Sequence, residues 1–297
     1  MRSFIKYIVN LIVISLLILI IGDIIYTYTF YKCIPRNKLQ YVLKNYDKNY
    51  DKNYDNVFIG SSRVANHIDV KYLDSLSGQK NLNLGVEGAN YADNLLMLEL
   101  FINNKNKVNK IFLQLDHFYE YNEMSAIANS DALPFIRNEV ISSHFKKYDK
   151  QYYSYYYLPF YRYQSADFKI GFREFFMSAI NKRSKIDFNY GYIPKYDSGD
   201  ITIPEEFPKK IADKNIFVEE IINLCKENDI ELILFCSPFC SYTRDLTYVD
   251  NLKKRYSSLN NYSKAMDDTF FSNCSHLNYK GARVFTHIIF DNHIKNE

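Results

Sequence analysis

Apolar and polar positions alternate along this chain in blocks that predict strands and helices in turn. Short apolar runs that end at glycine, serine or aspartate are typical of buried strands. They occur at residues 57–60, 81–84, 110–115 and 231–236. Apolar positions at helical spacing occur at residues 91–103, 216–228 and 278–294. Strands that alternate with helices predict an α/β domain with a mainly parallel sheet, in which functional residues gather at the carboxyl ends of the strands.

Residues 117–208 interrupt this alternation. They contain the Tyr-rich tract 151–163 and a helical pattern over residues 165–181. A segment of about ninety residues is too long to be a bare loop in a compact domain, so we expect an inserted subdomain. Its aromatic side chains either pack this subdomain onto the main sheet or line a surface for an acceptor or glycan, because rings stack on apolar sugar faces.

The N-terminal segment 8–25 is apolar on every side, and its length is close to the roughly 20 residues that cross a bilayer core. Tyr26, Tyr28 and Tyr31 follow it as an interfacial aromatic belt. We predict a single-pass membrane anchor over residues 1–31. A cleaved signal peptide is the alternative, but no small-x-small cleavage site follows the apolar run. Of the two orientations, we expect the N-terminus inside and the main domain outside the cytoplasm.

Residues 32–56 are predicted to be a polar tether between the anchor and a domain over residues 57–297. Residues 45–56 repeat a polar four-residue unit as NYDK, NYDK and NYDN, without apolar periodicity. A repeat so short cannot build a core of its own, so it predicts spacing between membrane and domain and not a solenoid.

Composition and charge exclude several classes. The chain carries 37 Lys and Arg against 34 Asp and Glu, a net charge of +3, which gives no charge excess for binding nucleic acid. Its 9 Gly and 7 Pro in 297 residues argue against collagen-like or linker-dominated chains. The histidines show no ligand spacing with cysteines or carboxylates, so we expect no metal and no cofactor.

The five cysteines are an odd number and do not form a framework of disulfides. Cys33 follows the predicted anchor and is a candidate for acylation. Cys240 and Cys274 fall on loops expected near the same edge of the sheet, so a bridge between them is conceivable in an oxidising compartment. Free cysteines packed in the core are the alternative.

Three positions offer the groups that a serine hydrolase needs. Ser62 follows the first strand at a tight turn, where its hydroxyl would project from a strand-to-helix corner and its own N–H could stabilise an oxyanion. Gly85 follows the second strand, where the absence of a side chain would let its N–H approach a substrate oxygen. His276 lies on a loop before the last helix, as a general base would. The alternatives are a helix N-cap for Ser62 and a turn glycine for Gly85.

With these residues in place, the chain resembles the SGNH/GDSL hydrolase superfamily, in its divergent membrane-anchored bacterial form. The first block of that family is Gly-Asp-Ser-Leu, and Gly60-Ser61-Ser62-Arg63 matches it with two substitutions, which makes Ser62 the nucleophile. The last block is Asp-x-x-His followed by Leu-Asn-x-x-Gly. Asn273-x-x-His276 followed by Leu277-Asn278-x-x-Gly281 matches it and makes His276 the base. The resemblance implies a three-layer flavodoxin-like fold and Gly85 as an oxyanion donor.

Two departures from the family pattern bear on activity. Asn273 stands where an aspartate orients the base, and an amide holds an imidazole without stabilising imidazolium by charge; Asp267 or Asp268 could take that part. The third block, Gly-x-Asn-Asp, is replaced by the residues at 114–117, so Asn90 or a residue of the insertion is a candidate for the missing donor. Arg63 and Asp116 are candidates for binding substrate or orienting the site, with ion pairing or capping as the alternative.

These observations predict a serine esterase or O-acyltransferase, such as an acetyltransferase, that acts on an acyl ester. The resemblance implies acylated carbohydrates, such as envelope polysaccharides, as substrates, and the insertion would shape the acceptor site. A membrane-embedded protein is a further candidate partner. The alternatives are a catalytically weakened module that binds glycan or a membrane partner, and a purely structural envelope component.

Overall fold

The computed structural model describes residues 2–44, 53–197, 199–203 and 206–295. Within these residues it is an α/β protein whose main sheet has five parallel strands, in the order β2-β1-β3-β4-β5. The strands are β1 (Asn53–Ile59), β2 (Asn81–Asn83), β3 (Lys107–Gln114), β4 (Glu231–Cys236) and β5 (Asn260–Asn261). The predicted α/β class with a mainly parallel sheet is confirmed.

Side chains along each central strand point alternately to two separate cores. Val57 and Ile59 of β1 belong to the larger core, whereas Phe58 between them belongs to the smaller one. The rings of Phe58 and Phe112 stack at 4.5 Å on that second face, and Phe235 of β4 continues the row. Continuous apolar runs are therefore needed in these strands, because both faces of the sheet are buried.

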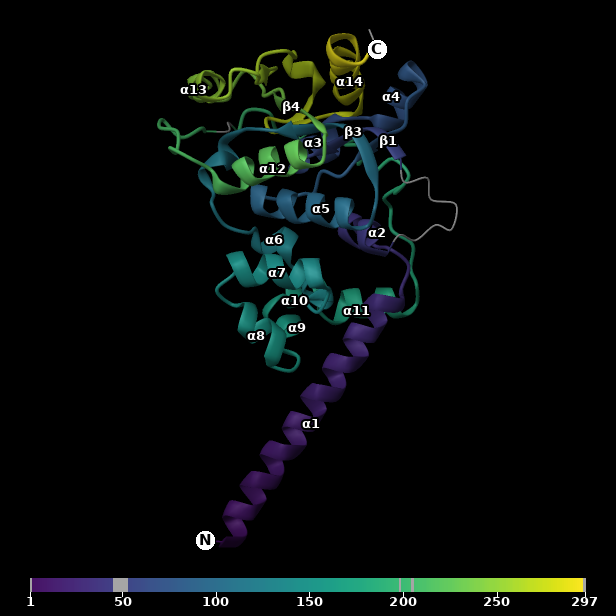
Figure 1. Ribbon diagram of the computed structural model, residues 1–297, viewed down its shortest axis with the longest axis vertical. Coiled ribbons are helices and arrows are strands. Elements are labelled where there is room, and N and C mark those ends of the chain that lie inside the picture. The colour runs from purple at the N-terminus through teal and green to yellow at the C-terminus, as the bar shows by residue number, and fades with distance from the viewer. Residues whose placement is uncertain (1, 45–52, 198, 204–205, 296–297) are drawn as a thin grey trace.

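Helices cover both faces of the sheet and make three layers (Figure 1). The larger core lies under α2 (Lys38–Lys44), α5 (Tyr91–Asn103) and α12 (Ile216–Glu227). The smaller core lies under α3 (Ser62–His67), α4 (Val70–Ser77) and α14 (Tyr279–His293). A further helix, α13 (Thr247–Arg255), precedes β5. The helices predicted at 91–103, 216–228 and 278–294 coincide with α5, α12 and α14 to within a residue or two.

The helical part of the insertion between β3 and α12 lies between the sheet and the N-terminal helix (Figure 1), and residues 180–197 of the insertion are not helical. Its helices are α6 (Ala126–Asn129), α7 (Glu139–Tyr148), α8 (Tyr152–Tyr157), α9 (Tyr161–Ser165), α10 (Asp167–Ile170) and α11 (Phe172–Ala179), with short 3₁₀ turns at His117–Glu120 and Leu133–Phe135. The single helix predicted over residues 165–181 is wrong. The chain is extended at Gly171, where a side chain would overlap Asp167, and this position separates α10 from α11.

The predicted tether over residues 32–56 is corrected at both of its described ends. Residues 38–44 form α2, whose Leu39, Tyr41 and Val42 are buried in the larger core. β1 begins at Asn53, and the amide of its buried Asn56 donates to the side-chain oxygens of Gln79 and Asn81. These hydrogen bonds let a polar segment enter the sheet. The rest of the repeat, residues 45–52, lies outside the described residues.

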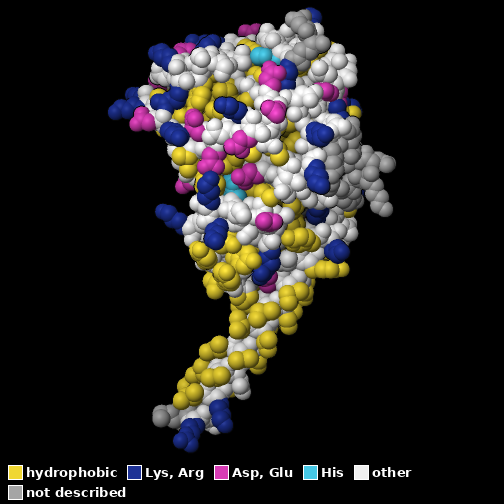
Figure 2. Space-filling view, viewed as in Figure 1, with side chains coloured by type: hydrophobic (Ala, Val, Ile, Leu, Met, Phe, Trp, Pro, Cys, Tyr) yellow, Lys and Arg dark blue, Asp and Glu magenta, His cyan; other side chains and the backbone are white. Residues whose placement is uncertain are grey.

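The N-terminal helix α1 (Arg2–Lys32) extends away from the domain (Figure 1). It is long and apolar enough to cross a membrane, and its apolar side chains are exposed along the protruding part (Figure 2). Only its last turns touch the insertion. Tyr26, predicted to belong to an interfacial belt, instead stacks on Phe175 of α11 at 4.0 Å, whereas Tyr28 stays exposed.

Candidate active site

The turn between β1 and α3 presents Ser62 at the carboxyl edge of the sheet. Gly60 has φ +158°, and a side chain there would overlap Val64 and Gln114, so the turn requires glycine. Ser61, in extended conformation, is the N-cap of α3, and its hydroxyl accepts a hydrogen bond from the N–H of Arg63. The capping function therefore belongs to Ser61, and the hydroxyl of Ser62 is available for another contact.

A short hairpin carries the predicted base. Its strands are β6 (Phe271–Asn273) and β7 (His276–Leu277), and Asn273 pairs with His276 across the turn. Asn278 then caps α14 by accepting from the N–H of Gly281. A side chain at Gly281 would lie 2.3 Å from the carbonyl oxygen of Phe270, so the helix can approach the hairpin this closely only at a glycine.

The structure brings Ser62, His276 and Asn273 together in a row. The Ser62 Oγ lies 2.8 Å from His276 Nε2, and His276 Nδ1 lies 3.0 Å from Asn273 Oδ1. Asn273 Oδ1 also accepts from the backbone N–H of Ser275 at 3.1 Å, which fixes this atom as an acceptor. His276 Nδ1 must then donate, so in the neutral ring Nε2 is unprotonated and accepts the Ser62 hydroxyl proton. This is the tautomer that a general base needs.

The carboxylates proposed as alternative partners for the base do not take that place. Asp268 accepts hydrogen bonds from the backbone N–H and from the hydroxyl of Ser241, a residue on the loop after β4. Asp267 is the N-cap residue of the short turn at Asp268–Phe270. The amide of Asn273 therefore holds the imidazole.

A second histidine, His67, packs beside the base, and the sequence patterns did not single it out. Its ring stands perpendicular to that of His276, with 6.2 Å between ring centroids, and its Nε2 accepts from the backbone N–H of Leu277 at 3.0 Å. Burial, then the charge that His276 carries when protonated, and then the charge of Arg63 lower the pKa of His67 well below its ordinary value. His67 is therefore neutral and fixes the backbone next to the base.

Arg63 and Asp116, two candidates for substrate binding, lie together under the nucleophile turn. Both are buried, with 3.8 Å between Arg63 Nη1 and Asp116 Oδ2, and the guanidinium stacks on the ring of Phe239 at 3.4 Å. Gln114 joins this pair to the turn, since its Nε2 donates to Asp116 and its Oε1 accepts from the N–H and hydroxyl of Ser61. Arg63 and Asp116 therefore have partners within the protein. Through Gln114 they support the backbone turn at Ser61.

Gly85 lies against α3 and its N–H already has an acceptor. A side chain there would meet the backbone nitrogen of Ala65 at 2.5 Å, so close packing alone requires glycine. The N–H donates to Asn83 Oδ1 at 3.0 Å. Lys38 Nζ donates to the same Asn83 oxygen and to the Gly85 carbonyl, and burial lowers the pKa of Lys38 to about 7. To act as an oxyanion donor, the Gly85 N–H would have to break its hydrogen bond to Asn83 Oδ1 and donate to the substrate oxygen instead.

Asn90 begins α5 and lines a narrow crevice together with Ser61 and Asp116. Its backbone N–H donates to Asp93, and its side-chain amide donates to the carbonyl of Glu123 at the start of the insertion, at 3.3 Å. Burial raises the pKa of Asp93 to about 7. Asn90 is therefore near the nucleophile turn but joins α5 to the insertion.

Cys240 and Cys274 form a disulfide bond, as the sequence allowed. This bond ties the loop after β4 to the hairpin between Asn273 and His276. Cys33, Cys225 and Cys236 are free and buried. Cys33, the candidate for acylation, is therefore covered in this structure. Among the described residues, no group of three or more His, Cys, Asp or Glu could hold a metal ion.

No protein-family model matches the chain, and no curated protein matches it. The structure itself defines an α/β protein with a parallel sheet, a long apolar N-terminal helix and a serine–histidine–asparagine row at the carboxyl edge of the sheet.

Proposed function

We propose that this chain is a membrane-anchored serine esterase or O-acyltransferase of the SGNH/GDSL type, with Ser62 as nucleophile, His276 as base and Asn273 as the residue that orients it. The observation that carries the proposal is the hydrogen-bonded row from Ser62 through His276 to Asn273, with the imidazole in the tautomer of a general base. The strand order 2-1-3-4-5 supports it, because this is the flavodoxin-like order, in which sites lie at the carboxyl edge of the sheet.

The first half of the proposed reaction acylates the serine. The Ser62 oxygen attacks the ester carbonyl while its proton moves to His276 Nε2, which gives a tetrahedral oxyanion and an imidazolium. The bond from the carbonyl carbon to the leaving oxygen then breaks, and His276 returns the proton to that oxygen. The products are an alcohol and an acyl-Ser62.

The second half removes the acyl group. His276 Nε2 takes a proton from water or from an acceptor hydroxyl, and the resulting oxygen nucleophile attacks the acyl-Ser62 carbonyl. The ester bond to Ser62 breaks and the serine oxygen regains its proton from His276. Water gives hydrolysis, and a sugar hydroxyl gives acyl transfer, so the acceptor that reaches His276 decides between the two.

The backbone N–H of Ser62 is the first oxyanion donor in this proposal, and the Gly85 N–H is the second. The second donor requires the Asn83 amide to give up its bond to Gly85 when substrate binds. One oxyanion donor contributes a factor of about 10²–10³ to the rate, so the rate of ester cleavage depends strongly on this exchange.

The location we propose is a single membrane span by α1, with the domain outside the cytoplasm. The apolar length of α1 supports the span. The Cys240–Cys274 disulfide supports an oxidising compartment, since such bonds are rare in reducing ones. Acylated polysaccharides of the envelope are substrates that a domain in this position can reach.

A second candidate is a module that binds glycan or a membrane partner with little catalysis. Two observations favour it: an amide in place of a carboxylate at Asn273, and the occupied N–H of Gly85. Both weaken stabilisation of charge in the transition state without disturbing the fold.

Ester hydrolysis by the full-length protein in detergent distinguishes the two candidates. We expect turnover of 4-nitrophenyl acetate that Ser62→Ala and His276→Ala abolish. Ser61→Ala is the matched control; it removes a cap and leaves the nucleophile, so activity should persist. Absence of turnover in a folded protein, or equal loss with Ser61→Ala, would favour the binding module.

A further inference from the structure

A hydrophobic surface surrounds the point where α1 joins the domain. Figure 2 shows apolar side chains on the insertion that continue directly into those of α1. The exposed members on the insertion are Tyr153, Tyr157, Leu158, Phe168, Phe172, Phe176 and Ile180. Tyr157 is 69% exposed and Leu158 51%, which is unusual for large apolar side chains that lie next to one another. We call this set the aromatic collar.

The turn between α8 and α9 lies beside the apolar part of α1. A groove of about 360 Å³ separates the two; α1 lines it with Leu16, Ile20 and Ile24, and the turn with Tyr157 and Leu158. Any solvent that surrounds Leu16 and Ile20 of α1 therefore also reaches the side chains of the turn. If α1 lies in lipid there, so does the turn.

The turn is held in place by polar contacts to α1. Arg162, whose side chain is 2% exposed, donates to Asp23 at 2.6 Å and to the hydroxyl of Thr27 at 2.8 Å. Asp23 also accepts from the backbone N–H of Phe160 at 2.8 Å, and the ring of Phe160 lies against Gly22. The turn is thus held to α1 by an ion pair with a buried arginine, in addition to the ring contacts of Tyr26 with Phe160 and Phe175.

The length of α1 sets the depth of the collar. From Phe4 to Asp23 the helix rises about 28 Å, which matches a hydrocarbon core of about 30 Å. Asp23 is then at the outer boundary of the core, and Leu16 is about 10 Å inside it. Leu158 shares the groove with Leu16, Ile20 and Asp23, so it lies beside this stretch of α1.

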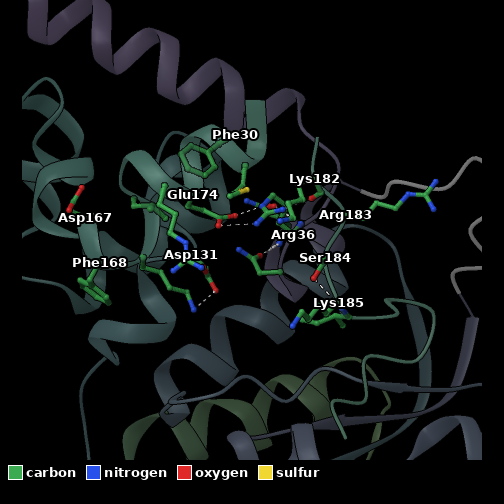
Figure 3. A pocket seen from close by; sticks show the side chains of 17 residues that line it. Phe30, Arg36, Asp131, Asp167, Phe168, Glu174, Lys182, Arg183, Ser184 and Lys185 are labelled. Carbon is green, nitrogen blue, oxygen red and sulfur yellow. Dashed lines mark hydrogen bonds and ion pairs between the residues drawn. The ribbon is translucent and has the colours of Figure 1, made fainter. Parts of the chain in front are cut away.

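Basic side chains lie where the lipid headgroups would be. A second pocket of about 550 Å³ lies beside Phe30, about 10 Å beyond Asp23 along the helix (Figure 3). Lys182, Arg183 and Lys185 line it and are exposed. Three carboxylates line it too: Glu174 pairs with Arg36, Asp131 pairs with Lys169, and Asp167 is exposed. Cations just outside an apolar face are typical of surfaces that bind anionic lipids.

We propose that the aromatic collar is a membrane-binding surface: the α8–α9 turn enters the outer leaflet of the bilayer that α1 spans, and the basic residues above it contact anionic phospholipid headgroups. The inference rests on the membrane span proposed above. It gives the insertion a task that the catalytic proposal does not need, namely to fix the distance and orientation of the domain relative to the membrane.

The absence of tryptophan from the chain permits a direct test, because each introduced tryptophan is the only one. Full-length Leu158→Trp and Tyr157→Trp are reconstituted in vesicles of phosphatidylcholine and phosphatidylglycerol. The acyl chains of these lipids carry bromine, which quenches tryptophan fluorescence on contact. One set of vesicles has the bromine near the carbonyl end of the chain and the other has it near the middle. Ile12→Trp reports the centre of the span. Val284→Trp, on exposed α14 at the far end of the molecule, reports water.

We expect blue-shifted emission from both turn reporters and strong loss of fluorescence, greater with bromine near the carbonyl end. Ile12→Trp should be quenched more by mid-chain bromine, and Val284→Trp by neither. If Ile12→Trp is quenched while both turn reporters behave like Val284→Trp, the collar proposal is overturned and the span stands. If Ile12→Trp is also unquenched, the span itself is wrong, and the collar proposal falls with it.

The headgroup contacts are tested with Phe168→Trp, which reports the pocket of Figure 3. With a nitroxide quencher placed on the headgroup of one lipid or the other, labelled phosphatidylglycerol should quench it more than labelled phosphatidylcholine does; acyl-chain bromine does not reach a reporter at this level. The difference should disappear when Lys182, Arg183 and Lys185 are replaced by glutamine. Equal quenching by the two lipids in the unsubstituted background would overturn the preference for anionic headgroups.

Discussion

The imidazole of His276 lies between an alcohol and an amide, and these two groups decide what it can do. Asn273 fixes the tautomer because its oxygen is already bound to the N–H of Ser275. The same amide carries no charge, so it does not stabilise the imidazolium that forms when Ser62 attacks. We therefore expect a correctly oriented but weak base.

Replacement of Asn273 by aspartate should raise the esterase activity. A carboxylate at this position stabilises imidazolium, and loss of that charge in a serine triad costs up to about 10⁴ in kcat, so a gain of at least about tenfold is expected. The pH–rate profile should also move, with the acid limb at higher pH, because the carboxylate raises the pKa of His276. Asn273→Ala, the matched control, should lower the rate. An unchanged rate in Asn273→Asp would argue that base strength does not limit the reaction.

Lys38 should make stability depend on pH. Its pKa is about 7 in the folded protein against 10.5 ordinarily, so between these pH values the unfolded chain binds more protons. The free energy of unfolding must then rise with pH across this window, by up to about 1.4 kcal/mol per pH unit for one group. In Lys38→Met, chemical denaturation at several pH values should show a smaller slope. Equal dependence of the unfolding free energy on pH in the two proteins would contradict burial of the Lys38 amine beside the Gly85 carbonyl.

Single residues of the site could be predicted from sequence where a local motif fixes them. Ser62, Asn273 and His276 stand in two short blocks that encode a turn and a hairpin, and the structure brings these blocks together. Gln114 and His67 could not be predicted, because their contacts cross between β3, α3 and the hairpin and leave no spacing in the sequence.

Among secondary-structure elements, those with a clear apolar pattern were predictable and those held by polar contacts were not. α5 begins and ends where its leucines predict. The first half of β1 has no apolar alternation, and Asn56 is satisfied only by side chains more than twenty positions away. The pattern over residues 165–181 continues through Gly171, where the backbone is extended and separates α10 from α11.

The disulfide between the β4 loop and the catalytic hairpin should matter for stability. Cys240 and Cys274 are 34 positions apart, and closing a loop of this size contributes about 4 kcal/mol in the chain-entropy account. Cys240→Ser with Cys274→Ser should lower the melting temperature and, by loosening the hairpin, the esterase rate. Cys225→Ser, a substitution at a free buried cysteine, is the control. If mass spectrometry finds both thiols free in protein from an oxidising compartment, the bond does not form.

At the scale of the whole molecule, α1 and the insertion are one unit joined by the ion pair of Asp23 and Arg162. The insertion separates the sheet from the apolar part of α1 (Figure 1), so contacts at the end of α1 determine how the domain is held. The predicted polar tether over residues 32–56 is wrong at α2, because the burial of Leu39, Tyr41 and Val42 depends on contacts with distant parts of the chain that the sequence does not show.

Asp23→Ala should loosen the insertion from α1. Removing one partner of a buried ion pair leaves an uncompensated charge and costs about 3–5 kcal/mol. Hydrogen exchange in full-length protein in nanodiscs should then increase in α8 to α11 and stay unchanged in the central sheet. The exchanged pair Asp23→Arg with Arg162→Asp should restore part of the protection. Unchanged exchange in Asp23→Ala would mean that apolar packing alone holds the insertion.

The central claim is that Ser62 is activated by His276, and fluorophosphonate labelling of the detergent-solubilised full-length protein tests it most directly. We expect one modified peptide by mass spectrometry, with the label on Ser62, and no label in Ser62→Ala or His276→Ala. The same substitution at an exposed histidine, His287→Ala, should leave labelling intact. No labelling of a folded protein, or labelling that persists without His276, would show that His276 does not activate Ser62.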